Sequence, residues 1–205
     1  MATRSGIPTD FSWRRYRSRL EARWAAFFSL LGWRFEYEPL DLDGWIPDFG
    51  IFGSTGRLAI LVEVKSYSTL AEFEADGVAA RYLGARDTRW PENLAPLRPV
   101  RPRIMLAGLR VFEGTFHPAA IGWITDADLW GGGFGEAALH DHELVRHEYP
   151  APSWLGWDVF HSTGAYQCVL SGTWDGARHL APAGFERVRR LWNEAANLVQ
   201  WKASA

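Results

Sequence analysis

Apolar residues recur at helical spacing near the start of the chain. This stripe consists of Tyr16, Leu20, Trp24, Phe27, Phe28 and Leu31. Such a repeat predicts an amphipathic helix that packs one face on a core. Asp10 can cap the helix at its start, and Gly32 ends it. Glu21 lies beside the stripe at its polar edge, so its carboxylate can reach over a neighbouring sheet.

Strand patterns follow this helix. Residues 35–37 alternate between apolar and polar, and residues 45–52 and 57–66 predict two strands that are joined by a turn over residues 53–56. The segment 58–64 is almost entirely apolar, which is typical of a strand that is covered on both faces. The pattern therefore predicts a hairpin within a buried sheet.

The rest of the chain predicts two more helices with short strands between them. A second helix is expected over residues 68–83, where acidic residues lie near its start, and a last helix over residues 185–201. Residues 84–102 are rich in arginine and proline and predict a loop. Strand patterns cover residues 103–107, 119–124, 137–139, 166–170 and 177–180.

This order of elements predicts an α/β protein with a central mixed β-sheet that is flanked by helices. Residues 1–110 would form the core. Residues 111–205 would extend the same domain with a β-rich segment and the final helix. A chain of 205 residues with an ordinary apolar fraction can bury a core of this size.

Two carboxylates meet on the predicted hairpin. Folded about its turn, the hairpin sets Asp48 directly opposite Glu63. Like charges in directly opposed positions repel each other, whereas Mg²⁺ would hold both because it prefers carboxylate oxygens. Lys65 lies two residues beyond Glu63 and so points to the same face. These three groups together predict a site for metal-assisted phosphodiester hydrolysis.

Lysine is rare in this chain. Of its 22 basic residues, only Lys65 and Lys202 are lysines, and the others are arginines. Arginine supplies a generic positive charge equally well, so a lysine at position 65 favours a role for a compact ammonium group with an adjustable pKa. The alternative is that the lysine stands there by chance.

These motifs resemble the PD-(D/E)XK nuclease superfamily. The match comprises Pro47-Asp48 and Glu63-Val64-Lys65, with Glu21 on the helix upstream. The ordered segments Arg-Ser-x-Leu-Glu, Tyr-Glu-Pro, Pro-Asp-Phe and Val-Glu-Val-Lys are similar to those of small phage- and mobile-element-associated members and of transposon end-cleaving endonucleases. The resemblance covers about residues 16–83 and implies a restriction-endonuclease-like core.

The predicted site gives each residue a role. Asp48, Glu63 and the main-chain carbonyl of Val64 would hold Mg²⁺, for which Mn²⁺ can substitute, and the ion would polarise the scissile phosphate and lower the pKa of a water. Lys65 would orient that water or stabilise the charge of the transition state. Glu21 would bind a water beside the metal or a second ion. The alternatives are a turn residue at Asp48, an edge-strand charge at Glu63 and a solvated helix carboxylate at Glu21.

Two groups of arginines suggest contact with nucleic acid. Arg14, Arg15, Arg17, Arg19 and Arg23 lie on the first predicted helix and can grip phosphates, or can line a solvated helix face. The second group, which flanks the proline-rich loop and would line the same groove, consists of Arg81, Arg86, Arg89, Arg98, Arg101 and Arg103.

Histidines and tryptophans mark the second half. His140, His142 and His147 include a His-x-His pair that can bind zinc, but the sequence has no cysteine near them, which favours surface histidines on a polar strand. The tryptophans favour core or interface packing over stacking on bases. They are Trp123, Trp130, Trp154, Trp157 and Trp174.

Charge and cysteine content narrow the class of protein. A net charge of −2 argues against coating nucleic acid by bulk electrostatics, although an enzyme needs only a local basic patch. The single cysteine, Cys168, excludes an internal disulfide. No signal peptide and no membrane span are expected, because the chain has neither a leading apolar run nor 18 consecutive apolar residues, so the cytoplasm is the expected compartment.

We therefore expect a Mg²⁺-dependent DNA endonuclease in a phage or mobile-element setting. The alternative is a catalytically silent nuclease-fold module that binds a protein or nucleic-acid partner through its tryptophan-rich second half. RNA hydrolysis is a third option that the site chemistry leaves open. One such site cuts one phosphodiester at a time, so a double-strand break would need a homodimer, a partner nuclease or sequential nicking. The apolar final helix would offer surface for that contact.

Overall fold

The computed structural model describes residues 6–42, 45–79, 102–125, 133–142, 156–162, 168–172 and 182–200. Its elements, in chain order, are β1 (Thr9–Phe11), β2 (Arg14–Tyr16), α1 (Arg19–Leu30), β3 (Arg34–Tyr37), β4 (Phe49–Phe52), β5 (Leu58–Val64), α2 (Leu70–Ala75), β6 (Arg103–Ala107), β7 (Ala120–Thr125), β8 (Phe134–Asp141), β9 (Trp157–His161) and α4 (Phe185–Leu198).

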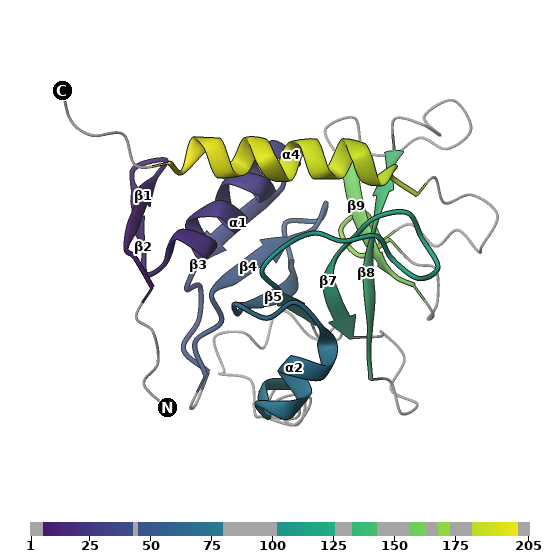
Figure 1. Ribbon diagram of the computed structural model, residues 1–205, viewed down its shortest axis with the longest axis horizontal. Helices are drawn as coiled ribbons and strands as arrows, with labels where there is room; N and C mark the ends of the chain where they lie inside the picture. Colours follow the sequence, from purple (N-terminus) through teal and green to yellow (C-terminus); the bar gives the residue numbers. More distant parts are fainter. Residues whose placement is uncertain are drawn as a thin grey trace.

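Seven of these strands form one sheet in the order β3-β4-β5-β6-β7-β8-β9, and β1 pairs only with β2 (Figure 1). Neighbouring strands of the large sheet are antiparallel except β5 and β6, which are parallel. The predicted α/β architecture with a central mixed sheet is therefore confirmed. Strands from both halves of the chain belong to this one sheet.

Helices cover both faces of the sheet. Helices α1 and α4 lie together on one face, and α2 lies on the other (Figure 1). Alternate residues of each central strand enter the two cores: Val62 of β5 packs under α1, whereas Leu61 packs with Phe73 of α2. The strand β5 is thus buried on both faces, as its almost entirely apolar sequence predicts.

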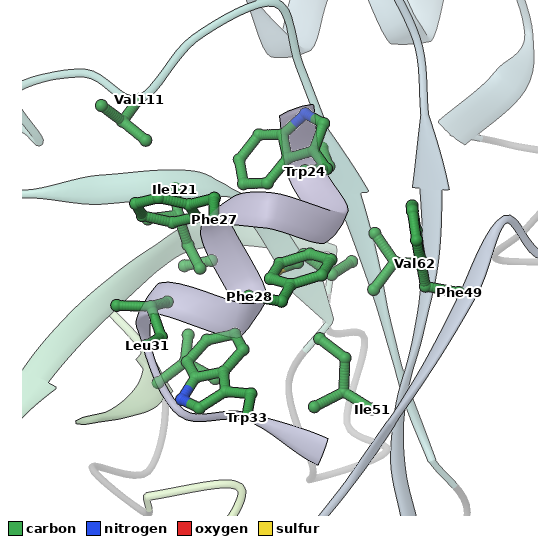
Figure 2. Packing of buried hydrophobic residues seen from close by; sticks show 14 of the residues in the cluster. Trp24, Phe27, Phe28, Leu31, Trp33, Phe49, Ile51, Val62, Val111 and Ile121 are labelled. Atoms are coloured by element: carbon green, nitrogen blue, oxygen red, sulfur yellow. The ribbon is translucent and has the colours of Figure 1, made fainter. Parts of the chain in front are cut away.

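Helix α1 is held by a cluster of aromatic rings (Figure 2). Trp24, Phe27 and Phe28 are fully buried, and the ring of Phe28 packs edge-to-face on Phe49 of β4. The indole Nε1 of Trp24 donates a hydrogen bond to the carbonyl of Gly108 at 2.9 Å. Deep packing of this helix fixes its first turn, and with it Glu21, relative to the sheet.

The two ends of the sheet are linked to each other. Trp33, just before β3, donates from its indole Nε1 to the carbonyl of Trp157 on β9 at 2.9 Å. The backbone N–H of Ser54, in the β4–β5 turn, donates to the carbonyl of Leu170 at 2.7 Å. The segment after β9 therefore contacts the hairpin that carries Asp48.

The first helix begins later than predicted. Residues 9–16 form a hairpin, because Ser12 and Trp13 take positive φ angles of 48° and 65°, the conformation of a two-residue type I′ turn. Ser18 caps α1 by accepting a hydrogen bond from the backbone N–H three residues later. The prediction of Asp10 as the cap is therefore wrong.

The second helix is shorter than predicted. Thr69 and Glu72 form a capping box at the start of α2, which ends at Ala75 rather than running to residue 83. Gly77 follows with a φ of 72°, a left-handed conformation that ends helices. Residues 80–83 and the predicted loop up to residue 101 lie outside the described residues.

The strands of the second half differ from their prediction. β8 includes the predicted residues 137–139, but β9 was not predicted. Residues 168–172 form a turn instead of a strand, because the carboxylate of Asp158 accepts the N–H groups of Leu170 and Ser171 that a strand partner would take. The predicted strand residues 166–167 and 177–180 lie outside the described part of the chain.

The final helix matches its predicted position, but its apolar face is buried. Val188, Trp192 and Ala195 of α4 pack into the core beside α1, and Leu198 is exposed. The expectation of a broad apolar surface on this helix is therefore wrong, because α1 already covers it. The prediction that the tryptophans pack in the core is confirmed for the two described members of that set, Trp123 and Trp157.

Candidate functional site

The β4–β5 hairpin brings two acidic residues together. The register of the two strands carries Asp48, one residue before β4, to the position opposite Glu63. The turn alone does not give this alignment, because a symmetric fold about residues 53–56 would set Asp48 opposite Leu61. The turn closes between Gly53 and Arg57, which shifts the register by one residue, and a bulge near the end of β4 shifts it by one more.

Asp48 is buried and engaged at both oxygens, with 2 % of its surface exposed. Oδ2 accepts the backbone N–H of Val64 at 2.7 Å, and Oδ1 accepts the guanidinium of Arg17. In an extended strand the N–H and C=O of one residue point to the same edge. The carbonyl of Val64 therefore lies along the edge that faces Asp48.

Glu63 is held by an aromatic and a basic side chain. Its Oε2 accepts the indole N–H of Trp45 at 2.8 Å, and its Oε1 accepts the ammonium of Lys65. Glu63 is 5 % exposed, whereas the side chain of Lys65 is 37 % exposed. The ammonium thus stands between the buried carboxylate and solvent, where a substrate can meet it.

Glu21 is anchored in the first turn of α1. Its Oε1 accepts the hydroxyl of Ser18 at 2.9 Å, and its Oε2 accepts the hydroxyl of Tyr37 at 2.5 Å. The backbone N–H of Arg17 also donates to Oε2 at 3.2 Å. Burial and the hydrogen bond to Glu21 raise the pKa of Tyr37, so this phenol keeps its proton and donates it.

The carboxylates influence each other electrically. Burial, and then the charge of Glu63, raise the pKa of Asp48 to about 7, and Glu21 adds to the increase. The N–H of Val64 and the charge of Lys65 oppose it. The contact with Arg17 opposes it as well, because a cation stabilises the carboxylate.

These residues form a set of oxygen ligands that lies beside two cations, Arg17 and Lys65. Two carboxylates and one carbonyl are the hard donors that Mg²⁺ and Mn²⁺ take. Burial and the neighbouring charge of Glu63 disfavour the ionised form of Asp48, and a bound cation would stabilise that form. The donor set and its charge therefore fit a divalent cation at Asp48, Glu63 and the carbonyl of Val64. Lys65 and Glu21 lie beside that position.

The arginines predicted to grip phosphates divide into three groups. Arg15 and Arg19 are exposed, the first on β2 and the second on α1. Arg14 and Arg17 are exposed but engaged, and the guanidinium of Arg14 donates to the carbonyl of Tyr37 at 3.1 Å. Arg17 is exposed over 58 % of its side chain but bridges Asp48 and Glu38, with a distance of 3.2 Å from Nε to the Glu38 carboxylate. Arg23 is not available, because its guanidinium lies 3.9 Å from the centre of the Trp192 ring and donates to that residue's carbonyl.

Of the second arginine group, only Arg103 lies within the described residues. Its side chain is buried on β6, with 6 % of the residue exposed. A buried guanidinium does not reach a nucleic acid, so the prediction that it lines a binding groove is wrong. The other members of that group lie outside the described residues.

The sequence did not indicate two residues that complete the site, Tyr37 and Trp45. Tyr37 belongs to the Tyr-Glu-Pro segment and ends β3, where its hydroxyl reaches Glu21. Trp45 forms an isolated bridge with Leu42 and reaches Glu63 from that position. Neither carries charge, so no charge pattern marks them; only the strand register could place them.

Comparisons of the chain with protein-family models, with curated proteins and with solved structures gave no match. None of the helices in the described part of the chain combines the length and apolar character that a membrane crossing requires.

Proposed function

We propose that the chain is a metal-dependent DNA endonuclease of the PD-(D/E)XK type, with a restriction-endonuclease-like core. One observation carries the proposal: two buried carboxylates, Asp48 and Glu63, stand opposite each other on a hairpin, and Lys65 emerges on the same side. A protein without a cation or substrate for this site gains nothing from burying two opposed charges. The ordered motifs that resemble this superfamily support the same conclusion.

The residues divide the work of phosphodiester hydrolysis. Asp48, Glu63 and the carbonyl of Val64 would hold Mg²⁺ or Mn²⁺. When bound, the ion supplies charge that polarises the phosphate and acidifies water. Lys65 is half-exposed, so its ammonium can turn from Glu63 toward a phosphate and stabilise the charge that develops there. Glu21 is oriented through Tyr37 and Ser18, which keeps its carboxylate at the rim of the site.

DNA is the proposed substrate, and Arg15 and Arg19 are the proposed phosphate contacts. Both are exposed and flank the segment that delivers Arg17 to Asp48. Arginine holds phosphate oxygens in a bidentate manner, which suits this role. The resemblance to phage- and mobile-element-associated members supports a role in cutting DNA of that origin. One site cuts one strand, so the isolated chain would nick DNA or act as a homodimer.

A second candidate function is a catalytically silent module that binds a protein or nucleic acid. A specific observation favours it: Arg17 already contacts Asp48, and Lys65 already contacts Glu63. These contacts neutralise the acidic pair within the chain. In an enzyme both cations must yield to the metal and to the substrate, whereas in a silent module they would remain.

The test is a cleavage assay on supercoiled, linear, branched and single-stranded DNA, and on RNA, with Mg²⁺, with Mn²⁺ and with a chelator. Cleavage of DNA that requires the metal supports the enzyme. Cleavage of RNA but not DNA would show that the substrate is RNA, while the proposed metal-dependent hydrolysis would still hold. No cleavage of any substrate, together with DNA binding that the chelator does not change, would favour the silent module.

The products also test the oligomeric state. Nicked circles that precede linear DNA indicate one active site in each encounter. Direct conversion of supercoiled DNA to linear DNA indicates two sites that act together. Sedimentation of the same preparation then distinguishes the cases, because concerted double-strand cleavage by a monomer would contradict the single-site proposal.

A further inference from the structure

A second cluster of metal-ligating side chains lies at the other end of the sheet. The ligand atoms of His140, His142 and Cys168 all lie within 4.8 Å of one another, and all three side chains are buried. The imidazole rings of His140 and His142 meet edge-to-face with their centres 4.4 Å apart. The proposed endonuclease chemistry uses none of these residues.

The fold builds this cluster from two strands and a turn. His140 belongs to β8 and His142 follows its last residue. Their spacing of two residues and the contact between their rings place both on one face of the sheet. Cys168 opens the turn of residues 168–172, which Gly172 closes by donating its N–H to the carbonyl of Cys168 at 3.0 Å. The turn lies against β9, because Val169 donates to Val159 at 2.8 Å.

Asp158 organises both parts of the cluster. It stands directly opposite His140 in the register of β8 and β9, and it is fully buried. Its carboxylate accepts the N–H groups of Leu170 and Ser171, each at 2.8 Å, and lies 3.3 Å from Nε2 of His142. A carboxylate accepts hydrogen bonds, so Nε2 of His142 is the donor and its Nδ1 keeps a lone pair.

We propose that His140, His142 and Cys168 bind a zinc-class transition-metal ion, with Asp158 orienting His142. Two imidazoles and a thiolate are the borderline and soft donors that Zn²⁺ takes, whereas Mg²⁺ prefers oxygen. A carboxylate that accepts the second N–H of a ligating histidine recurs in zinc sites and fixes the ring orientation. Three protein ligands leave the fourth position to a water or another side chain.

The present spacing allows an ion after small movements. Bond lengths of about 2.0–2.1 Å to nitrogen and 2.3 Å to sulfur put tetrahedral ligand atoms roughly 3.3–3.7 Å apart. The ligand atoms are at present at most 4.8 Å apart. Side-chain rotations that move these atoms by about an ångström would bring them to the distances that a tetrahedral ion needs.

A metal here would tie the turn of residues 168–172 to β8. The same turn accepts a hydrogen bond from Ser54 of the β4–β5 hairpin, at the carbonyl of Leu170. The ion would therefore stabilise the segment that joins the last strand of the sheet to the hairpin. This role is structural and does not depend on whether the acidic site cuts DNA.

The experiment measures Zn²⁺ and Co²⁺ binding to the full chain by metal analysis and absorption spectroscopy. We expect one ion per chain, a thiolate-to-cobalt charge-transfer band and intense visible bands of a tetrahedral ion. A hundredfold excess of free Zn²⁺ over its Kd should raise the Tm by about 5–10 °C. All measurements use the double variant Asp48→Asn, Glu63→Gln as the background protein. It lacks the acidic ligands, so zinc bound at the acidic site does not contribute to the signal.

Three variants give the decisive comparison. Cys168→Ala should abolish the charge-transfer band, and His142→Asn should lower affinity at least about 100-fold. Asp158→Asn should lower it about 10–100-fold while keeping the band. His117→Asn, a histidine outside the cluster, is the matched control and should bind as the background protein does. Folding of each variant is checked by circular dichroism.

Two results would overturn the proposal. One is a metal-free protein on which Co²⁺ gives no thiolate band. The other is equal zinc affinity of the background protein and folded Cys168→Ala. Neither result depends on nuclease activity, so failure of the endonuclease proposal and failure of this site remain distinguishable.

Discussion

The two candidate metal sites of this chain differ in their ligands and in how the chain builds them. The acidic site joins Asp48 and Glu63, which are 15 residues apart on one hairpin. The histidine–cysteine site joins β8 to a turn that follows β9. Oxygen donors suit a hard ion that must also meet a substrate, whereas nitrogen and sulfur donors suit a tightly held softer ion.

The acidic site also has exposed basic side chains beside its ligands. The cations beside the acidic site reach solvent, because the side chain of Arg17 is 58 % exposed and that of Lys65 is 37 % exposed. The ligands themselves are buried at both sites: Asp48 and Glu63 are 2 % and 5 % exposed, and His140, His142 and Cys168 are 1 %, 5 % and 1 % exposed. The exposed ammonium of Lys65 beside the acidic pair is a group that a substrate as large as DNA can meet. We therefore infer chemistry at the acidic site and structural stabilisation at the other, which the following variants can test.

The largest expected effect is the loss of cleavage when either acidic residue is removed. Asp48→Ala or Glu63→Ala removes a metal ligand and should lower the cleavage rate by about 10³-fold or more. Neither change removes apolar packing, so the fold should persist. Rates are measured under single-turnover conditions with saturating Mg²⁺, and the matched control is Glu36→Ala, an exposed carboxylate on β3.

The same variants sharpen the contrast between the sites. Asp48→Ala and Glu63→Ala should keep the thiolate-to-cobalt band, because the cobalt ligands lie elsewhere. Cleavage at the wild-type rate by a repurified Asp48→Ala protein would show that the acidic site does not take part in the reaction. Loss of the cobalt band in the same folded variant would show that the two regions are not independent.

The next effect concerns the ammonium group of Lys65. Lys65→Arg keeps the charge but replaces a compact ammonium with a planar, wider guanidinium. We expect about a 100-fold lower rate with Mg²⁺ affinity changed little. Arg57→Lys, an exposed exchange of the same pair of residue types on the hairpin, is the control and should cleave normally. Equal turnover by Lys65→Arg and wild type would make Lys65 an ordinary surface cation.

The pH dependence of the free energy of unfolding tests whether the fold disfavours the ionised form of Asp48. Its pKa is raised to about 7 in the fold, so between about pH 4 and pH 7 the folded chain binds more protons here than the unfolded chain. This contribution to stability is present below about pH 4 and is lost as the pH rises through 7. Without divalent ions, the decline should be on the order of a few kcal/mol.

Chemical denaturation at a series of pH values measures this decline, and Asp48→Asn should flatten it. The readout is the slope with pH, because the substitution also removes the contact with Arg17 and changes absolute stability. Glu74→Gln, an exposed carboxylate of α2, should leave the slope unchanged. Added Mg²⁺ should restore stability above pH 7 in the wild type alone. An unchanged slope in Asp48→Asn would show that Asp48 is ionised without strain.

The acidic site is the region that sequence predicts well, and the reason is physical. Strand pairing has a period of two, so Glu63 and Lys65 must share a face once β5 exists. The hairpin is local, so a small error in register is the main risk. The closure of the turn between Gly53 and Arg57 and a one-residue bulge together give the register that a symmetric turn over residues 53–56 would lack. Helix boundaries were less predictable, because the start of α1 depends on the unusual backbone of Ser12 and Trp13.

The histidine–cysteine site shows where sequence reasoning stops. His140 and His142 were visible as a pair, but Cys168 lies 26 residues beyond His142 and was not connected to them. The connection depends on β9 and on the carboxylate of Asp158, which turns the chain back over that strand. Nothing in a strand-like pattern reveals a turn whose hydrogen bonds come from a buried side chain.

The smallest expected effect concerns Arg17, whose guanidinium contacts the carboxylate that the metal would need. Arg17→Gln should tighten Mg²⁺ binding by a few-fold, because the ion no longer competes with a charge-assisted hydrogen bond. Calorimetric titration with Mg²⁺ at pH 8, without DNA, measures the change. Arg19→Gln, an exposed neighbour on α1, removes the same charge and should leave Mg²⁺ affinity within about twofold of wild type. If both variants tighten binding equally, the effect is general electrostatics. Weaker binding in Arg17→Gln would instead mean that Arg17 holds Asp48 in position for the metal.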